Sequence, residues 1–154
     1  MSLGGGGGGG GQMQQLQEQM QALEQEKQAI RAEIQNLRNE QSEIDEAIEA
    51  IETLDTGSTV QVPIGGDAYV RAEIQDIDEV IVTLGGGYAA ERDSDGAIDS
   101  LGDKQDALDD RIEELQDEIQ TVEEETANLE AKAQQAQQQQ MQQLQQQMQQ
   151  QEDE

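Results

Sequence analysis

The sequence lacks most of the side chains on which catalytic and metal sites are built. It contains no Cys and no His, and its only aromatic residues are two tyrosines. This composition excludes disulfides, thiolate and imidazole metal sites and the usual proton shuttle. Carboxylates are plentiful, but acidic clusters such as residues 123–125 lack the DxDxDG spacing of a calcium loop. We therefore predict a protein that is not an enzyme and holds no metal or cofactor.

Positive charge is also scarce. The chain contains eight Lys and Arg and 35 Asp and Glu, which gives a formal net charge of −27. Such a chain repels nucleic-acid phosphates and anionic membrane surfaces. It has no run of about 18 apolar residues for a membrane span, and its N-terminus lacks the basic and apolar regions of a signal peptide. We predict a soluble, cytoplasmic protein that binds neither nucleic acid nor membrane.

The acidity itself has two interpretations. The carboxylates form either an ordinary solvated surface or an adaptation to a salt-rich cytoplasm, where salt screens their mutual repulsion. The excess of 35 acidic over eight basic residues favours the second interpretation. We therefore predict that the protein comes from a halophile.

Two long segments carry an unbroken heptad pattern. In each segment twelve positions follow at alternating steps of three and four, and ten of the twelve are apolar. A pattern of this length predicts a coiled coil, with helices at residues 13–54 and 95–148. The first seam consists of Met13, Leu16, Met20, Leu23, Lys27, Ile30, Ile34, Leu37, Gln41, Ile44, Ile48 and Ile51. The second consists of Ile98, Leu101, Gln105, Leu108, Ile112, Leu115, Ile119, Val122, Thr126, Leu129, Ala133 and Ala136.

The matching seam lengths predict that the two helices pair antiparallel. Setting Ile51 against Ile98 then places Met13 opposite Ala136. In this register Gln41 and Gln105 fall in adjacent layers. The two amides either bond to each other and fix the register, or lie solvated without mutual contact.

Between the helices, in residues 57–93, the apolar pattern changes to a period of two. Four short apolar runs are separated by Gly65-Gly66-Asp67, by Asp76-Ile77-Asp78 and by three glycines at 85–87. This predicts four strands in two hairpins. An apolar strand followed by glycines also begins many phosphate-binding loops. Here no lysine and no GK[ST] or GxGxxG motif accompanies the glycines, so the pattern favours a turn.

Two hairpins alone are marginally stable, and a two-helix coil offers them no broad surface. We therefore expect other subunits to cover their apolar faces and open edges. The predicted fold class is α+β: a long antiparallel two-helix coiled coil with two β-hairpins at the bend that join an oligomeric β-barrel. The predicted assembly residues are Val60, Val62, Ile64, Val70, Ile74, Val80, Val82 and Leu84.

The ends of the chain have biased compositions. Residues 4–11 are consecutive glycines, and residues 134–151 contain 14 glutamines. We predict a flexible tail at 1–12, a single domain at 13–148 and a disordered acidic tail at 149–154. The last apolar residues of the domain lie one residue out of phase with the seam that ends at Ala136, which predicts looser pairing there.

The order of long helix, two hairpins and long helix resembles the alpha type of the archaeal prefoldin family. The most specific part is residues 59–91. There Val62-Pro63-Ile64 leads through a glycine turn to a strand, and Val80-Ile81-Val82 leads to a second glycine turn and Tyr88. Two hairpins rather than one indicate the alpha type. The glycine run and the glutamine-rich end depart from the family pattern.

This resemblance implies a hexamer of two alpha and four beta subunits. In the family the hairpins form a double β-barrel platform, from which six coiled-coil tentacles hang. The implied activity is ATP-independent holding of non-native polypeptides and their transfer to a group II chaperonin.

We predict that clients contact the free ends of the two helices, because the unbranched methionine side chain adapts to many shapes. The alternative interpretation is that the apolar residues at these helix ends only complete the coiled-coil seam. The alternative function is a structural or scaffolding coiled coil that binds one defined partner, and protection of several unrelated unfolded proteins distinguishes the two. The predicted client-binding residues are Met13, Leu16, Met20, Met141, Leu144 and Met148.

Overall fold

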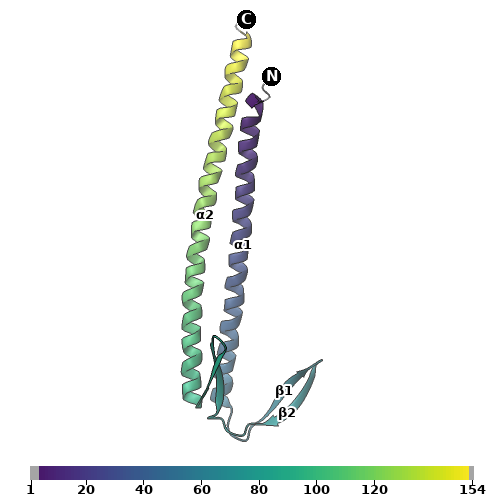
Figure 1. The fold of residues 1–154 in the computed structure, drawn as a ribbon, viewed down its shortest axis with the longest axis vertical. Coiled ribbons are helices and arrows are strands. Elements are labelled where there is room, and N and C mark those ends of the chain that lie inside the picture. Colours follow the sequence, from purple (N-terminus) through teal and green to yellow (C-terminus); the bar gives the residue numbers. More distant parts are fainter. Residues whose placement is uncertain (1–3, 153–154) are drawn as a thin grey trace. The chain divides into compact units, whose positions relative to one another are not determined.

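The computed structural model describes residues 4–152, with side chains from residue 11 onward. In chain order it contains α1 (Gly4–Thr53), β1 (Thr59–Gly65), β2 (Ala68–Glu73), β3 (Val80–Gly85), β4 (Tyr88–Arg92) and α2 (Ser94–Glu152) (Figure 1). Two long helices with two hairpins between them confirm the predicted α+β fold.

The chain forms two compact units. The terminal unit contains α1 up to Ile34 and α2 from Glu114 onward, and the hairpin unit contains residues 35–113. In the terminal unit the two helices run antiparallel, so the beginning of α1 and the end of α2 lie at the same end of this unit (Figure 1).

The core of both units follows the heptad seams. Every one of the predicted seam positions is buried or half-buried, whereas the residues between them are mostly exposed. The most deeply buried seam side chain is Leu115, with 1% of its surface exposed. Lys27, a polar seam position, forms an ion pair with Glu123 at 3.1 Å across the terminal unit. The seam thus buries its apolar side chains and lets the lysine reach a carboxylate at its edge.

Gln41 and Gln105 follow neither of the two alternatives expected for them. Each side-chain amide donates a hydrogen bond to the main-chain oxygen of the other glutamine, at 3.4 Å in both cases. Gln41 also donates to Asp109 Oδ1 at 2.5 Å, and Gln105 donates to Asp45 Oδ1. The two glutamines therefore bind the opposite helix reciprocally, through its main chain and its carboxylates rather than through each other's side chains.

Each hairpin is a separate antiparallel two-stranded sheet. Val62 pairs with Val70 between β1 and β2, and Val82 pairs with Ala90 between β3 and β4. Closure of these sheets into a barrel with other subunits stays a prediction.

Both hairpins turn through backbone conformations with positive φ. The central residues are Gly66 and Asp67 in the first turn, at φ 58° and 61°, and Gly86 and Gly87 in the second, at 62° and 81°. Two such residues in succession define the type I′ turn, whose twist matches that of the flanking strands. The glycines after β3 therefore have a conformational role.

Asp93 caps the start of α2. Its side-chain Oδ1 accepts a hydrogen bond from the main-chain N–H of Gly96 at 2.7 Å, and its main-chain oxygen accepts one from Ala97. Asp78 in the loop before β3 accepts a further hydrogen bond from the Ser94 hydroxyl at 3.0 Å. This capping ties the second hairpin to the first turn of the helix.

The helices extend further than the sequence predicted. α1 begins at Gly4, inside the segment expected to be a flexible tail, and α2 continues to Glu152 instead of ending at residue 148. Extending an existing helix gains one hydrogen bond per residue without a new nucleation step, which allows unfavourable residues to join it. Residues 1–3 and 153–154 of the predicted tails lie outside the described residues. Over residues 4–152, neither helix has the length and apolar character that a membrane crossing requires.

Candidate interaction surfaces

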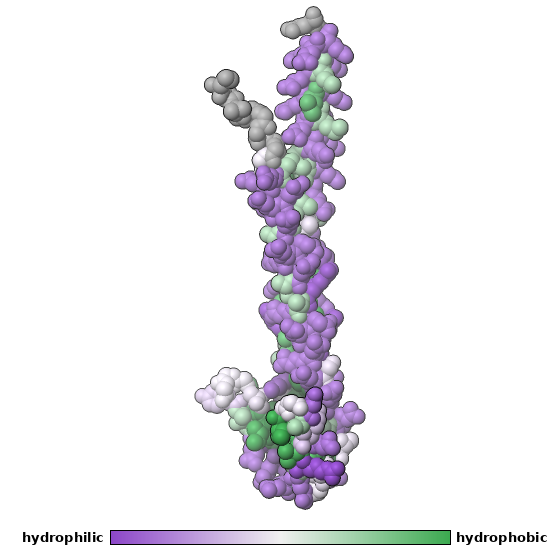
Figure 2. All heavy atoms as spheres, turned by 90° about the vertical axis from the view of Figure 1, so that its right-hand side faces the viewer, coloured by the Kyte–Doolittle hydropathy of each residue, from purple (hydrophilic) through white to green (hydrophobic). Residues whose placement is uncertain are grey.

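Large apolar side chains are exposed in two places among residues 11–152. The first place, which we call the hairpin surface, consists of Val62, Ile64, Tyr69, Val70, Ile81, Leu84 and Tyr88. The second, which we call the tip stripe, consists of Met141, Leu144 and Met148. Figure 2 shows hydrophobic surface on the hairpins and toward the end of α2, with mostly hydrophilic surface along the coil.

On the first hairpin, both faces are exposed to solvent, including the face that the sequence predicted to be apolar. Because Val62 and Val70 are opposite each other in the ladder, their side chains share one face of the sheet. Both are exposed, as is Ile64. The neighbouring predicted residues Val60 and Ile74 are half-buried. The β1–β2 sheet thus presents an apolar face that this chain leaves largely uncovered.

On the second hairpin, one face packs within the chain itself. Val82 has only 4% of its surface exposed. On the same strand, Leu84 lines a groove together with Ser100 and Lys104 of α2, so this sheet lies against the beginning of the helix. Val82 was predicted as an assembly residue, but its side chain is buried inside the subunit. Val80 is half-buried and Leu84 is exposed.

The opposite face of β3 carries an exposed residue that the sequence interpretation missed. Ile81 is 75% exposed and pairs with Glu91 on the side away from Val82. The run of three apolar residues at 80–82 contained the signal, because successive strand residues point to opposite faces. Tyr69 and Tyr88, each close to a hairpin turn, are also exposed and were not predicted.

The six predicted client-binding residues divide into two groups. Leu16 is 8% exposed, and Met13 and Met20 are half-buried, so these three residues of α1 belong to the seam. The tip stripe of α2 is open to solvent, with exposures of 64%, 59% and 68% for its three residues. The structure therefore gathers only the second group into an exposed surface.

The position of the tip stripe explains its exposure. Gln12 lies level with α2 near Gln135 and Gln139, since all three line one groove. Because the helices are antiparallel, α2 beyond residue 139 extends past Gln12, the first residue of α1 that lines this groove. The residues that precede Gln12 in the sequence, 4–11, are glycines, and glycine has no side chain with which to cover an apolar partner. From Gln12 onward, α1 therefore offers the stripe no seam partner.

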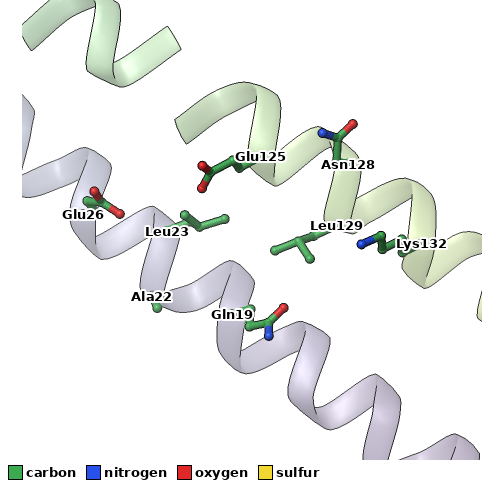
Figure 3. Close-up of a pocket in the computed structure, with 8 residues that line it drawn as sticks. All are labelled: Gln19, Ala22, Leu23, Glu26, Glu125, Asn128, Leu129 and Lys132. Atoms are coloured by element: carbon green, nitrogen blue, oxygen red, sulfur yellow. The ribbon is translucent and has the colours of Figure 1, made fainter. Parts of the chain in front are cut away.

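Shallow grooves border the seam toward this end of the terminal unit. Three grooves are lined by residues from 12–26 of α1 and 125–139 of α2. In the first of them Leu23 and Leu129 face each other from opposite helices, and polar side chains including Glu125 and Lys132 form the rim (Figure 3). The coil therefore has shallow grooves along residues 12–26 and 125–139, before the tip stripe begins.

Comparison with known proteins agrees with this architecture. The family model described as "Prefoldin subunit" matches residues 11–139. The chain therefore belongs to the prefoldin family of molecular chaperones. Its curated relatives are alpha subunits. Prefoldin subunit alpha of Halobacterium salinarum is 66% identical over 105 residues, which cover 68% of this chain and 67% of the relative.

Other relatives support the same assignment. Prefoldin subunit alpha of Natronomonas pharaonis is 79% identical over 50 residues, which cover 32% of this chain and 33% of the relative. A solved structure of filamentous PFD from Methanocaldococcus jannaschii aligns with a TM-score of 0.52 at 25% identity, covering 78% of this chain and 96% of that one. The prefoldin beta subunit from Thermococcus strain KS-1 shares the fold, with a TM-score of 0.53 at 21% identity, covering 81% and 91%.

These findings confirm the resemblance to the archaeal alpha type. Most of the closely matching relatives come from halophilic archaea, in agreement with the net charge of −27. The chain is a prefoldin chaperone subunit.

Proposed function

We propose that two copies of this chain assemble with four beta subunits through the hairpin surface, and that the complex holds non-native polypeptides at the tip stripe without ATP. The observation that carries this proposal is the distribution of exposed large apolar side chains. Among residues 11–152 they occur only on the hairpins and at residues 141–148. Exposed apolar clusters of this kind mark interaction sites.

The two surfaces suit different kinds of partner. The hairpins have antiparallel strand ladders, each with one register irregularity next to its turn, and open edges that another subunit can extend. The tip stripe consists of two methionines and a leucine on a single helix, and Met141 lines a shallow groove with Gln137 and Gln138. Methionine-rich surfaces re-pack against many shapes, as binding of unrelated clients requires. We further propose that the complex acts in the cytoplasm and passes its clients to a group II chaperonin.

Mixing this chain with a beta subunit and measuring the mass of the complex tests the assembly. We expect two copies of this chain and four beta subunits. Light scattering then tests holding: the complex keeps several unrelated denatured proteins from aggregating in the absence of ATP, and adding a group II chaperonin with ATP restores their native activity. Binding of one defined partner without protection of unrelated proteins would favour a scaffolding function instead.

A further inference from the structure

The end of the terminal unit differs from the rest of the chain in its charge. Residues 12–17 of α1 and 133–151 of α2 contain no Asp, Glu, Lys or Arg, although the whole chain has a net charge of −27. We call these two segments the neutral tip. Charge returns at Glu152, one helical turn after Met148. The match to the family model ends at residue 139. Residues 140–151 of the neutral tip lie beyond this point, and residues 133–139 lie just before it.

The tip stripe lies inside this neutral segment. Its three residues are exposed, and the glutamines around them are exposed as well. Gln137 and Gln138 line a shallow groove together with Met141. The surface available to a partner is therefore a short apolar line bordered by uncharged amides.

A second copy of this chain is a poor occupant for this surface. The stripe has three apolar residues within eight positions, whereas a stable coiled coil needs about three to four heptads. A specific interface between folded proteins generally buries at least about 1,000 Å², which three side chains on one helix do not reach. The stripe instead fits a short, transiently held segment of an unfolded polypeptide.

We propose that the neutral tip is specialised for unfolded segments of strongly acidic polypeptides. This inference rests on the proposed holding function and names its client class. A salt-rich cytoplasm favours acidity in its other proteins as it does in this one. Even at about 1 M salt, where the Debye length is about 3 Å, charges in contact are incompletely screened. A tip that carried the acidity of the rest of the coil would repel such clients at contact distance.

The glutamines also supply hydrogen-bond donors that acidic side chains lack. A carboxylate can only accept hydrogen bonds, whereas each glutamine amide both donates and accepts. The exposed amides beside Met141 can therefore bind client carboxylates and main-chain groups while the stripe contacts apolar side chains. Glutamate at the same positions would offer neither the donors nor the neutrality.

The test adds charge to the tip without changing its shape. The tip variant carries Gln137→Glu, Gln138→Glu and Gln145→Glu, all at exposed positions of the neutral tip. A matched control adds the same charge elsewhere in the terminal unit, at exposed positions, through Gln25→Glu, Gln28→Glu and Gln116→Glu. Each variant is assembled with the beta subunit, and its mass and helical circular dichroism are checked against wild type.

Protection is measured for one strongly acidic and one basic denatured protein of similar size. The measurement uses the lowest KCl concentration at which all complexes are folded. We expect the tip variant to need about three- to tenfold more complex for half-maximal protection of the acidic protein, with no loss for the basic one. The control should match wild type for both proteins, and the difference should shrink as KCl rises. Equal losses for both proteins, or no loss for the acidic one, would overturn the inference.

A third variant separates this inference from the holding function on which it rests. Met141→Gln, Leu144→Gln and Met148→Gln remove the stripe but keep the tip neutral. Weaker protection of both proteins supports holding at the tip stripe. If this loss occurs but the tip variant does not discriminate between acidic and basic proteins, only the client class is wrong. Wild-type protection by the stripe variant would overturn the holding function, and the client class with it.

Discussion

At the scale of single residues, the polar seam positions all find partners. Lys27 pairs with Glu123, Gln41 and Gln105 bind the opposite helix, and the Thr126 hydroxyl donates to the Val122 main-chain oxygen at 2.8 Å. In the part of the chain that the structure describes, no buried side-chain nitrogen or oxygen lacks a hydrogen-bond partner. These polar positions therefore cost the coil some apolar burial without leaving unsatisfied groups in it.

Gln41 and Gln105 should lower the thermal stability of the coiled coil while they define the register of its two helices. Replacing both Gln41 and Gln105 with Leu should raise the melting temperature of the chain, because an apolar seam residue contributes about 1.5–3 kcal/mol when buried. Thermal circular dichroism at constant KCl measures this. The control, Gln28→Leu with Gln116→Leu at exposed positions, should leave the melting temperature nearly unchanged. An unchanged or lower melting temperature for the seam variant would contradict the interpretation.

The second hairpin turn should depend on backbone conformation alone. Gly86 has φ 62°, and a Cβ added there would meet Tyr88 Cδ2 at 3.8 Å, an ordinary contact. Gly86→Val should therefore destabilise the hairpin by about 1–2 kcal/mol through strain, and Gly86→Asn should be tolerated, because Asn adopts positive φ readily. Hydrogen exchange of the amides at 80–92 should accelerate for Val and not for Asn. Similar exchange in both variants would show that the turn does not require this conformation.

At the scale of elements, the sequence was sufficient to predict those segments whose apolar residues recur with a single period and therefore lie on one face. Both heptad seams and the turns were predicted in full, and so was the alternation that places Val62 and Val70 on one face of β1–β2. On β3 the sequence was not sufficient, because a strand with apolar residues on both faces does not reveal which face packs internally. Burial of Val82 and exposure of Ile81 follow from the position of this sheet against α2, which no local pattern encodes. The hydrogen bonds from Gln41 and Gln105 to main-chain oxygens of the opposite helix likewise depend on the distance between the helices, which the sequence pattern does not give.

The two hairpins should respond differently when a valine is replaced by aspartate. Val70→Asp should leave the stability of the isolated chain nearly unchanged, since Val70 is exposed there, but should block assembly with the beta subunit. Val82→Asp should instead lower the free energy of unfolding of the isolated chain by about 3 kcal/mol or more, because Val82 is buried within it. Thermal unfolding of the chain and the mass of the mixed complex measure both effects. Normal assembly of the Val70 variant would argue against the hairpin surface as the assembly site.

At the scale of the whole molecule, charge is distributed unevenly along the chain. The acidic residues occupy the hairpins, most of the coil and the last three positions, whereas residues 4–17 and 133–151 are uncharged. The acidity agrees with the similarity to relatives from halophilic archaea, and the neutral segments coincide with the part of the coil that carries the tip stripe. Composition thus distinguishes the tip stripe, which lies in an uncharged segment, from the hairpin surface, which lies among acidic residues.

The melting temperature should rise with salt. Repulsion within a chain of net charge −27 weakens as the Debye length falls from about 10 Å at 0.1 M to about 3 Å at 1 M KCl. A variant with fewer carboxylates, carrying Glu40→Gln, Glu52→Gln and Glu118→Gln at exposed positions, should show a smaller rise. Melting temperatures that do not vary with KCl would contradict the halophilic interpretation of the acidity.

The central claim is that this subunit assembles through its hairpins and holds clients through the end of α2. Deleting residues 141–154 tests it most directly, because the deletion removes the tip stripe and leaves both seams and all four strands in place. Assembled with the beta subunit, the shortened chain should give a complex of the expected stoichiometry. Because weak contacts act together across several subunits, this complex should need about three- to tenfold more protein than the full-length complex to protect each of several unrelated clients. Equal protection by the two complexes would show that clients are not held at the tip stripe.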